Sequence, residues 1–136
     1  MPATAQKSAH QSAQQQTSKI LYAESDEATL SARAAEIAKA GLQVTTTLNR
    51  QGVLEALRRE TLLHKTFDLV ILGATLSKDD RHHLPYMVKK SHAGTKVLVM
   101  HAGTHHHEVD AAVDPTLSMP RILEKIAALF QTPSGG

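Results

Sequence analysis

The chain has 136 residues, which leaves room for one domain of ordinary size and excludes a catalytic domain joined to a separate regulatory one. Fifteen Lys and Arg residues against thirteen Asp and Glu give a formal charge of +2, spread along the chain rather than concentrated in the basic stripe that DNA binding needs. The absence of cysteine excludes disulfide bonds, thiolate zinc sites and cysteine nucleophiles. No run approaches the roughly 20 apolar residues of a membrane helix. We therefore expect a cytoplasmic protein that binds neither nucleic acid nor membrane.

Both ends of the chain are polar. Residues 1–18 contain no Leu, Ile, Val or aromatic side chain, and they lack the apolar stretch of a secretory signal. Such a segment cannot bury enough apolar surface to offset the entropy of ordering, so we predict a disordered leader. Residues 131–136, which include one Pro and two Gly, are predicted to form a flexible tail. The folded unit is therefore expected to span residues 19–130.

Within this unit, the apolar residues alternate between the spacing of strands and that of helices. Apolar or threonine-rich runs predict strands at 20–23, 42–48, 67–72 and 97–100, and a weaker fifth strand at 111–113. Helical spacing predicts helices at 26–40, 49–62 and 119–130. A turn-like stretch at 73–80 precedes a short segment at 81–90, in which Pro85 lies early enough not to break a helix. This order predicts an α/β fold with a doubly wound, five-stranded parallel sheet.

Functional residues in open parallel sheets lie beyond the carboxyl ends of the strands. The first predicted strand is followed by the polar residues Glu24, Ser25 and Asp26. The third is followed by Gly73 and the fourth by His101. These positions are therefore the candidate site.

Three segments of the chain resemble the motif strands of CheY-like response-regulator receiver domains: KILYAESDE (19–27), FDLVILGATL (67–76) and KVLVMHA (96–102). The resemblance covers nearly all of residues 19–130 and implies a flavodoxin-like fold. In that family a histidine kinase phosphorylates an aspartate after the third strand. The aspartate lies beside an acidic pair that holds Mg²⁺, a Thr or Ser, and a Lys. The resemblance thus implies a part in bacterial two-component signalling.

Carried over residue by residue, the functional positions of the family fall on other residue types. The phosphoacceptor position falls on Gly73, which has no side chain to phosphorylate. The acidic pair falls on Glu24 and Ser25, so one carboxylate is lengthened and the other becomes an alcohol. The Thr or Ser position falls on His101, and a His101 side chain that fills the pocket is one way to fix a permanently active conformation.

The lysine position falls on Pro115 or, in a second alignment, on Asp114, and the lysine is lost in both. Asp26 aligns one place past the acidic pair, and we interpret it as a cap or first-turn carboxylate of the following helix. Because two of the three Mg²⁺ carboxylates are missing, we expect neither a metal nor another cofactor. The resemblance therefore implies a degenerate pseudo-receiver that lacks the phosphoacceptor Asp.

Two segment lengths also depart from the family. His101 and Pro115 are fourteen positions apart, which leaves no room for a full fourth helix, two loops and the last strand. We therefore predict that the fourth helix is shortened or absent. The second helix, by contrast, looks extended by residues 61–66 relative to the family.

Nine histidines raise the question of a metal site, since imidazole binds Zn²⁺, Ni²⁺ and Cu²⁺. His105, His106 and His107 are consecutive, and adjacent side chains rarely converge on one ion. His101 and His105 have helical spacing, but a site there requires that the stretch be helical. We interpret these residues, and His82 and His83 in another loop, as solvated histidines. Nothing resembling a nucleophile elbow surrounds Ser25 or Ser77, so we expect no enzymatic activity.

Two hypotheses for the function remain. The first is a receiver-like module that binds a protein partner of a signalling pathway without being phosphorylated, and for which we allow a weak homodimer. The second is a response regulator of a two-component phosphorelay, phosphorylated at a non-standard residue such as Asp79 or Asp80.

Overall fold

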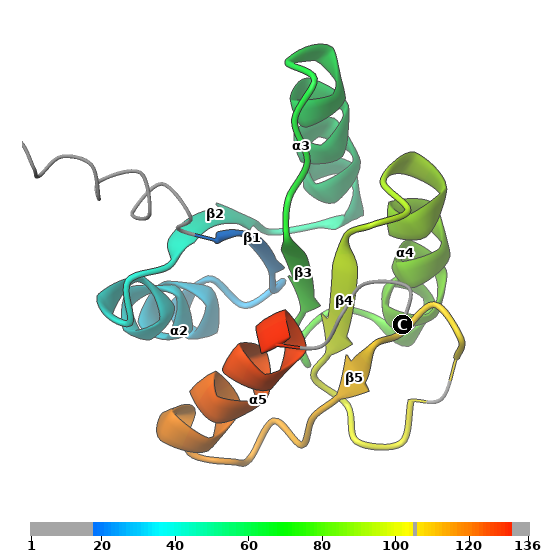
Figure 1. Ribbon diagram of the computed structural model, residues 1–136. Helices are drawn as coiled ribbons and strands as arrows, with labels where there is room; N and C mark the ends of the chain where they lie inside the picture. Colours follow the sequence, from blue (N-terminus) through cyan, green and yellow to red (C-terminus); the bar gives the residue numbers. More distant parts are fainter. Residues whose placement is uncertain (1–17, 105, 132–136) are drawn as a thin grey trace, which may run out of the picture.

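Five parallel strands form one sheet, as predicted (Figure 1). The computed structural model describes residues 18–104 and 106–131. The strands are β1 (Lys19–Ala23), β2 (Gln43–Thr47), β3 (Leu69–Leu72), β4 (Lys96–Val99) and β5 (Ala111–Ala112). Their order in the sheet is β2-β1-β3-β4-β5. The predicted leader and tail fall mainly on residues 1–17 and 132–136, which lie outside the described residues. Ser18 itself belongs to the sheet region, because its carbonyl accepts a hydrogen bond from the Gln43 N–H at 3.0 Å.

Helices cover both faces of the sheet. They are α2 (Glu27–Lys39), α3 (Arg50–Leu62), α4 (Lys78–Ser91) and α5 (Met119–Gln131). Figure 1 shows α3 and α4 on one side of the sheet, and α2 and α5 on the other. In the described part of the chain, no helix is both long and apolar enough to cross a membrane.

The core lies in two layers, one on each face of the sheet. Alternate residues of the central strands point to opposite faces, so Val70 and Leu72 pack toward α3 and α4 while Leu69 and Ile71 pack toward α2 and α5. All four residues of β3 are buried, because helices cover both of its faces. This burial explains why the central strands read as continuous apolar runs in the sequence.

Side-chain caps start three of the helices. Asp26, Asn49 and Ser77 accept hydrogen bonds from the backbone N–H three residues on, at the starts of α2, α3 and α4. The cap role that the sequence predicted for Asp26 is thus confirmed. The segment predicted at 81–90 begins earlier than predicted, because Ser77 caps α4 and the helix starts at Lys78. Pro85 therefore lies inside the helix, where it is buried against the core.

The second helix ends at residue 62, as its apolar spacing predicted, and residues 63–66 do not extend it. α3 ends at Leu62, and His64 takes a left-handed conformation with φ of 58°. The His64 N–H then donates to the Thr61 carbonyl and the Lys65 N–H to the Glu60 carbonyl, at 3.0 and 2.8 Å. These two bonds form a Schellman motif, which satisfies carbonyls of the last helical turn and stops the helix.

The connection between β4 and β5 confirms the prediction of a shortened or absent helix. Its described residues form turns and bends instead of a helix. Asp110 anchors the end of this connection, because its Oδ2 accepts hydrogen bonds from the Val97 N–H at 2.7 Å and from Lys89 Nζ at 2.8 Å. Asp110 thus ties this connection to both α4 and β4.

Candidate functional site

Glu24 and Gly73 lie side by side at the carboxyl ends of β1 and β3. The register pairs Ala23 with Leu72, and the Gly73 N–H donates to the Ala23 carbonyl at 2.8 Å. Glu24 is therefore the next residue opposite Gly73 in the ladder. Both residues are buried, and the Glu24 side chain has no exposed surface. The structure thus brings together two of the residues that the sequence singled out.

The buried Glu24 carboxylate has a full set of hydrogen-bond donors. Its Oε2 accepts from the Tyr22 hydroxyl at 2.5 Å, since residues two apart on a strand share a face. Its Oε1 accepts from both the backbone N–H and the hydroxyl of Thr75, at 2.9 and 2.6 Å. A buried carboxylate is stable only when such partners replace water. Glu24 is therefore a structural part of the site, held from two sides.

This carboxylate occupies the space that a side chain at position 73 would need. A Cβ atom added to Gly73 would lie 1.9 Å from Glu24 Cδ and 2.0 Å from Glu24 Oε1. No non-bonded atoms tolerate such distances, and the obstacle is the buried end of a side chain that is fixed by hydrogen bonds. The carboxylate at this point of the fold comes from β1, and the residue after β3 has to be glycine.

Thr75 links the loop after β3 to the loop after β1. Its hydroxyl donates to Glu24 and accepts from the backbone N–H groups of Ser25 and Asp26, at 2.8 and 3.1 Å. The Ser25 hydroxyl in turn donates to the Thr75 carbonyl. These contacts join the two loops around one threonine, so neither loop moves without breaking bonds to the other.

A cation approaches the carboxylate from α2. Arg33 NH1 lies 3.7 Å from Glu24 Oε2, and Arg33 NH2 donates to the Pro115 carbonyl at 2.8 Å. Arg33 is partly buried, with 22% of its side chain exposed. It connects Glu24 to the loop after β5, where the family resemblance placed its missing lysine. The positive charge of the site is thus supplied by a helix that the resemblance does not point to.

The Tyr22 hydroxyl stays protonated in this setting. Burial raises the pKa of Tyr22 well above its ordinary value, and the hydrogen bond to the Glu24 carboxylate acts in the same direction. Tyr22 is therefore a permanent donor to Glu24 rather than an acid that takes part in proton transfer.

His101 does not fill the pocket, and that expectation is wrong. His101 is exposed, and its ring lies near its own loop. A Cβ atom added to Gly103 would lie 3.9 Å from His101 Nδ1. The physical reason is that Glu24 already occupies the buried space with bonded partners. His101 is thus left in solvent at the end of β4.

The residues of this site do not fit Mg²⁺. The oxygens of Glu24 face Tyr22 and Thr75, Gly73 contributes no ligand, and Oδ2 of Asp26 accepts from the N–H and hydroxyl of Thr29. Mg²⁺ needs several free hard oxygens in octahedral geometry. The oxygens of Glu24 instead accept hydrogen bonds from within the protein.

We predict that the Asp26 cap makes stability depend on acid pH. Hydrogen bonds from the Thr29 hydroxyl and backbone N–H hold the pKa of Asp26 below its ordinary value of 3.8. A carboxyl group whose pKa is lower in the folded state than in the unfolded state stabilises the fold at any pH above its unfolded-state pKa. This contribution is lost as the pH falls through the folded-state pKa. The urea unfolding midpoint at pH 7 should therefore be higher for the wild type than for Asp26→Asn. The difference between the two midpoints should become smaller below about pH 4. A difference that stays constant from pH 7 to pH 3 would contradict this account.

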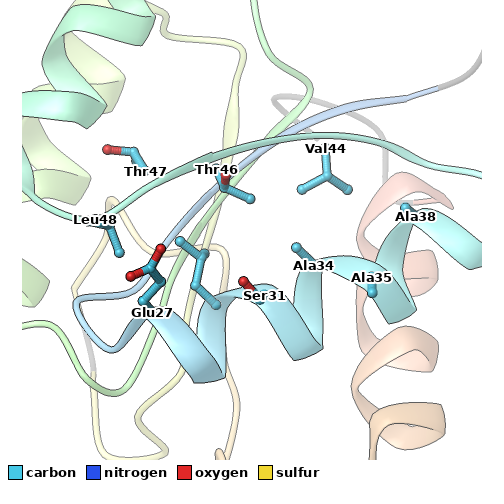
Figure 2. Close-up of a pocket in the computed structure, with 10 residues that line it drawn as sticks. Glu27, Ser31, Ala34, Ala35, Ala38, Val44, Thr46, Thr47 and Leu48 are labelled. Carbon is cyan, nitrogen blue, oxygen red and sulfur yellow. The ribbon is translucent and has the colours of Figure 1, made fainter.

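A groove of about 600 Å³ lies apart from these contacts, between α2 and the edge strand β2. Figure 2 shows Val44 and Thr46 of β2 facing Ala34 and Ala38 of α2 across it. Its one titratable lining residue is Glu27, at the start of α2. The groove therefore lacks the groups that acid–base or metal chemistry needs.

The sequence interpretation missed Tyr22, Arg33 and Thr75. The contact between Tyr22 and Glu24 could have been predicted, because residues two apart on a strand point to the same face. Arg33 follows the capping Asp26 by seven positions, two helical turns, which puts both on one side of α2. No sequence signal shows that the Thr75 hydroxyl is the joint between the two loops.

Comparisons with known proteins agree with the architecture. No family model matches the chain, and no curated protein matches it in sequence. A CheY-like response regulator receiver domain protein from Methanospirillum hungatei JF-1 is 18% identical, with a TM-score of 0.70 over 85% of this chain and 94% of that one. A two-component response regulator from Clostridium difficile is 15% identical, with a TM-score of 0.68 over 85% and 97% of the chains.

A third similar structure is the response regulator protein TrrA from Thermotoga maritima, solved in complex with Mg²⁺ and BeF. It is 17% identical, with a TM-score of 0.67 over 83% of this chain and 99% of that one. At these identities the likeness establishes the fold alone. The chain has the five-stranded, flavodoxin-like fold of CheY-like receiver domains.

Proposed function

We propose that this receiver-fold domain is a pseudo-receiver, a protein-interaction module of a signalling pathway that works without phosphorylation and without catalysis. One observation carries the proposal: the Glu24 carboxylate occupies the volume that an acceptor side chain at position 73 would need, 1.9 Å from its Cβ. The site therefore has neither the acceptor nor the space for one.

The alternative of phosphorylation at Asp79 or Asp80 has less support. Both residues lie in the first turn of α4, and Asp80 Oδ1 lies 3.1 Å from Arg50 Nε on α3. Phosphoryl transfer needs an acceptor surrounded by groups that compensate the charge of the transition state. The cation of the Glu24 site, Arg33, is engaged with Glu24 and Pro115 instead.

The test exposes the protein to a small phosphodonor and to a mimic of the phosphoryl group. Titration with Mg²⁺ and beryllofluoride should leave the amide shifts of Ser25, Gly73 and His101 unchanged, because Gly73 carries no carboxylate and that of Glu24 is bonded to Tyr22 and Thr75. Incubation with acetyl phosphate should add no phosphoryl mass to the intact protein. TrrA, whose structure contains Mg²⁺ and BeF, is the positive control under the same conditions.

Saturable shifts with the mimic, or a phosphoryl adduct, would overturn the proposal. An adduct that disappears in Asp79→Asn or Asp80→Asn would establish the alternative in its place. Each result assigns the site to one of the two functions.

A further inference from the structure

Two histidines that are distant in sequence meet between α4 and the connection from β4 to β5. His82 belongs to α4, not to a loop as predicted, and His106 lies in the connection between β4 and β5. Their ring centroids are 4.9 Å apart and their planes meet at 78°. His82 is exposed and His106 is half-buried, so solvent and ions reach the pair.

The spacing of the two rings fits a shared metal ion. Two imidazoles that bind one Zn²⁺ at about 2.0–2.1 Å, with a tetrahedral angle between them, have ring centroids about 5 Å apart. The outer torsion of a histidine side chain is broad, so an exposed ring turns at small cost to point a nitrogen at the ion. The pair thus offers two zinc ligands with little rearrangement.

One copy of the chain does not complete such a site. Among residues 18–104 and 106–131, no group of three or more His, Cys, Asp and Glu side chains is arranged to hold a metal. The two acids of the connection between β4 and β5 have other partners: Glu108 lies 2.9 Å from His107 Nε2, and Asp110 accepts from Lys89. Zinc in structural sites takes four ligands, so two positions stay open. We propose that His82 and His106 form half of a Zn²⁺ site, which a second copy of the chain completes in a two-fold dimer.

The surface around the pair suits a contact between two copies. Tyr86 follows His82 by one helical turn and is 52% exposed, so its ring is available for a contact. Together with Lys89, Lys90, His107 and Glu108 it lines a hollow of about 410 Å³. Two-fold symmetry presents the same patch from both sides, so each Tyr86 ring would enter the contact beside the ion. Buried tyrosines of this kind contribute strongly to interfaces.

The test measures mass and zinc content together. The full chain, without an affinity tag and freed of metal by a chelator, is titrated with ZnCl₂ at neutral pH. Sedimentation velocity should show conversion from monomer to dimer, and atomic emission should find one zinc per two chains in the dimer. EDTA should restore the monomer. His82→Ala and His106→Ala should each abolish the zinc-dependent dimer, whereas the matched exposed-histidine controls His83→Ala and His101→Ala should keep it.

Tyr86→Lys provides a second test that leaves both ligands in place. It should weaken the zinc-dependent dimer, because it replaces the ring with a charge in the contact, while the circular dichroism spectrum stays unchanged. Zinc bound one per chain by a monomer would overturn the proposal. A dimer that persists in both His82→Ala and His106→Ala, or no zinc binding, would do so as well. None of these results depends on whether the module is phosphorylated.

Discussion

Replacing Gly73 with Ala is expected to destabilise the domain by about 3 kcal/mol or more, although the change adds one methyl group. The new Cβ would lie 1.9 Å from Glu24 Cδ, and the carboxylate cannot move aside without giving up its bonds to Tyr22 and Thr75. Gly73 does not have a positive φ, so backbone strain adds nothing to this cost. The measurement is the urea unfolding midpoint at constant slope.

Gly94→Ala is the matched control. A Cβ on Gly94 would meet no atom within 4 Å, and this glycine also lacks a positive φ, so its replacement should change stability by less than about 0.5 kcal/mol. A double variant, Glu24→Ala with Gly73→Ala, separates the clash from other effects. Its loss of stability should be smaller than the sum of the two single losses, because the atoms that collide are gone. Strict additivity would show that the two positions are not coupled.

The same geometry decides what Gly73→Asp does. The variant places an aspartate where the family has its acceptor, but its side chain has to enter the space of the Glu24 carboxylate. Two carboxylates in one buried site also repel each other. Gly73→Asp alone should therefore not become phosphorylated by acetyl phosphate.

The fold was predictable because its signals are local or periodic. The central strands are buried on both faces, so they read as apolar runs, and Asp26 and Asn49 mark helix starts by residue type. The local sequence is more ambiguous at other helix ends. The end of α3 depends on His64 taking a left-handed conformation, which is uncommon for a residue other than glycine. The start of α4 was placed late because Ser77 was not recognised as its cap.

The site was predictable only in what it lacks. Glycine at position 73 means that this residue brings no carboxylate to the end of β3. The carboxylate that lies there is that of Glu24, and its place depends on the register between β1 and β3, since Glu24 and Gly73 are 49 positions apart in sequence. It depends also on the reach of Arg33 from a helix. The local sequence predicts neither that Glu24 fills the space beside Gly73 nor where the long Arg33 side chain reaches.

The residues of the site depend on one another. The glycine after β3 makes room for the Glu24 carboxylate after β1, and Arg33 brings a positive charge to that carboxylate from α2. Thr75 satisfies the carboxylate and joins the neighbouring loops at the same time. These contacts favour one fixed state of the loops, which supports the interaction module that we propose.

Glu24→Ala should therefore be among the most destabilising substitutions in the domain, at about 3–5 kcal/mol, with a fall in Tm of at least about 10 °C. It leaves the buried Tyr22 hydroxyl, the Thr75 N–H and the partly buried Arg33 guanidinium without their shared acceptor. Tyr22→Phe, which removes one donor, should cost only about 1 kcal/mol. Glu36→Ala is the control, because that half-exposed glutamate pairs with Lys39 at the surface and its loss should cost less than about 0.5 kcal/mol. If calorimetry finds Glu24→Ala as stable as the control, the carboxylate does not hold the loops together, and the proposal of a pocket closed by Glu24 fails.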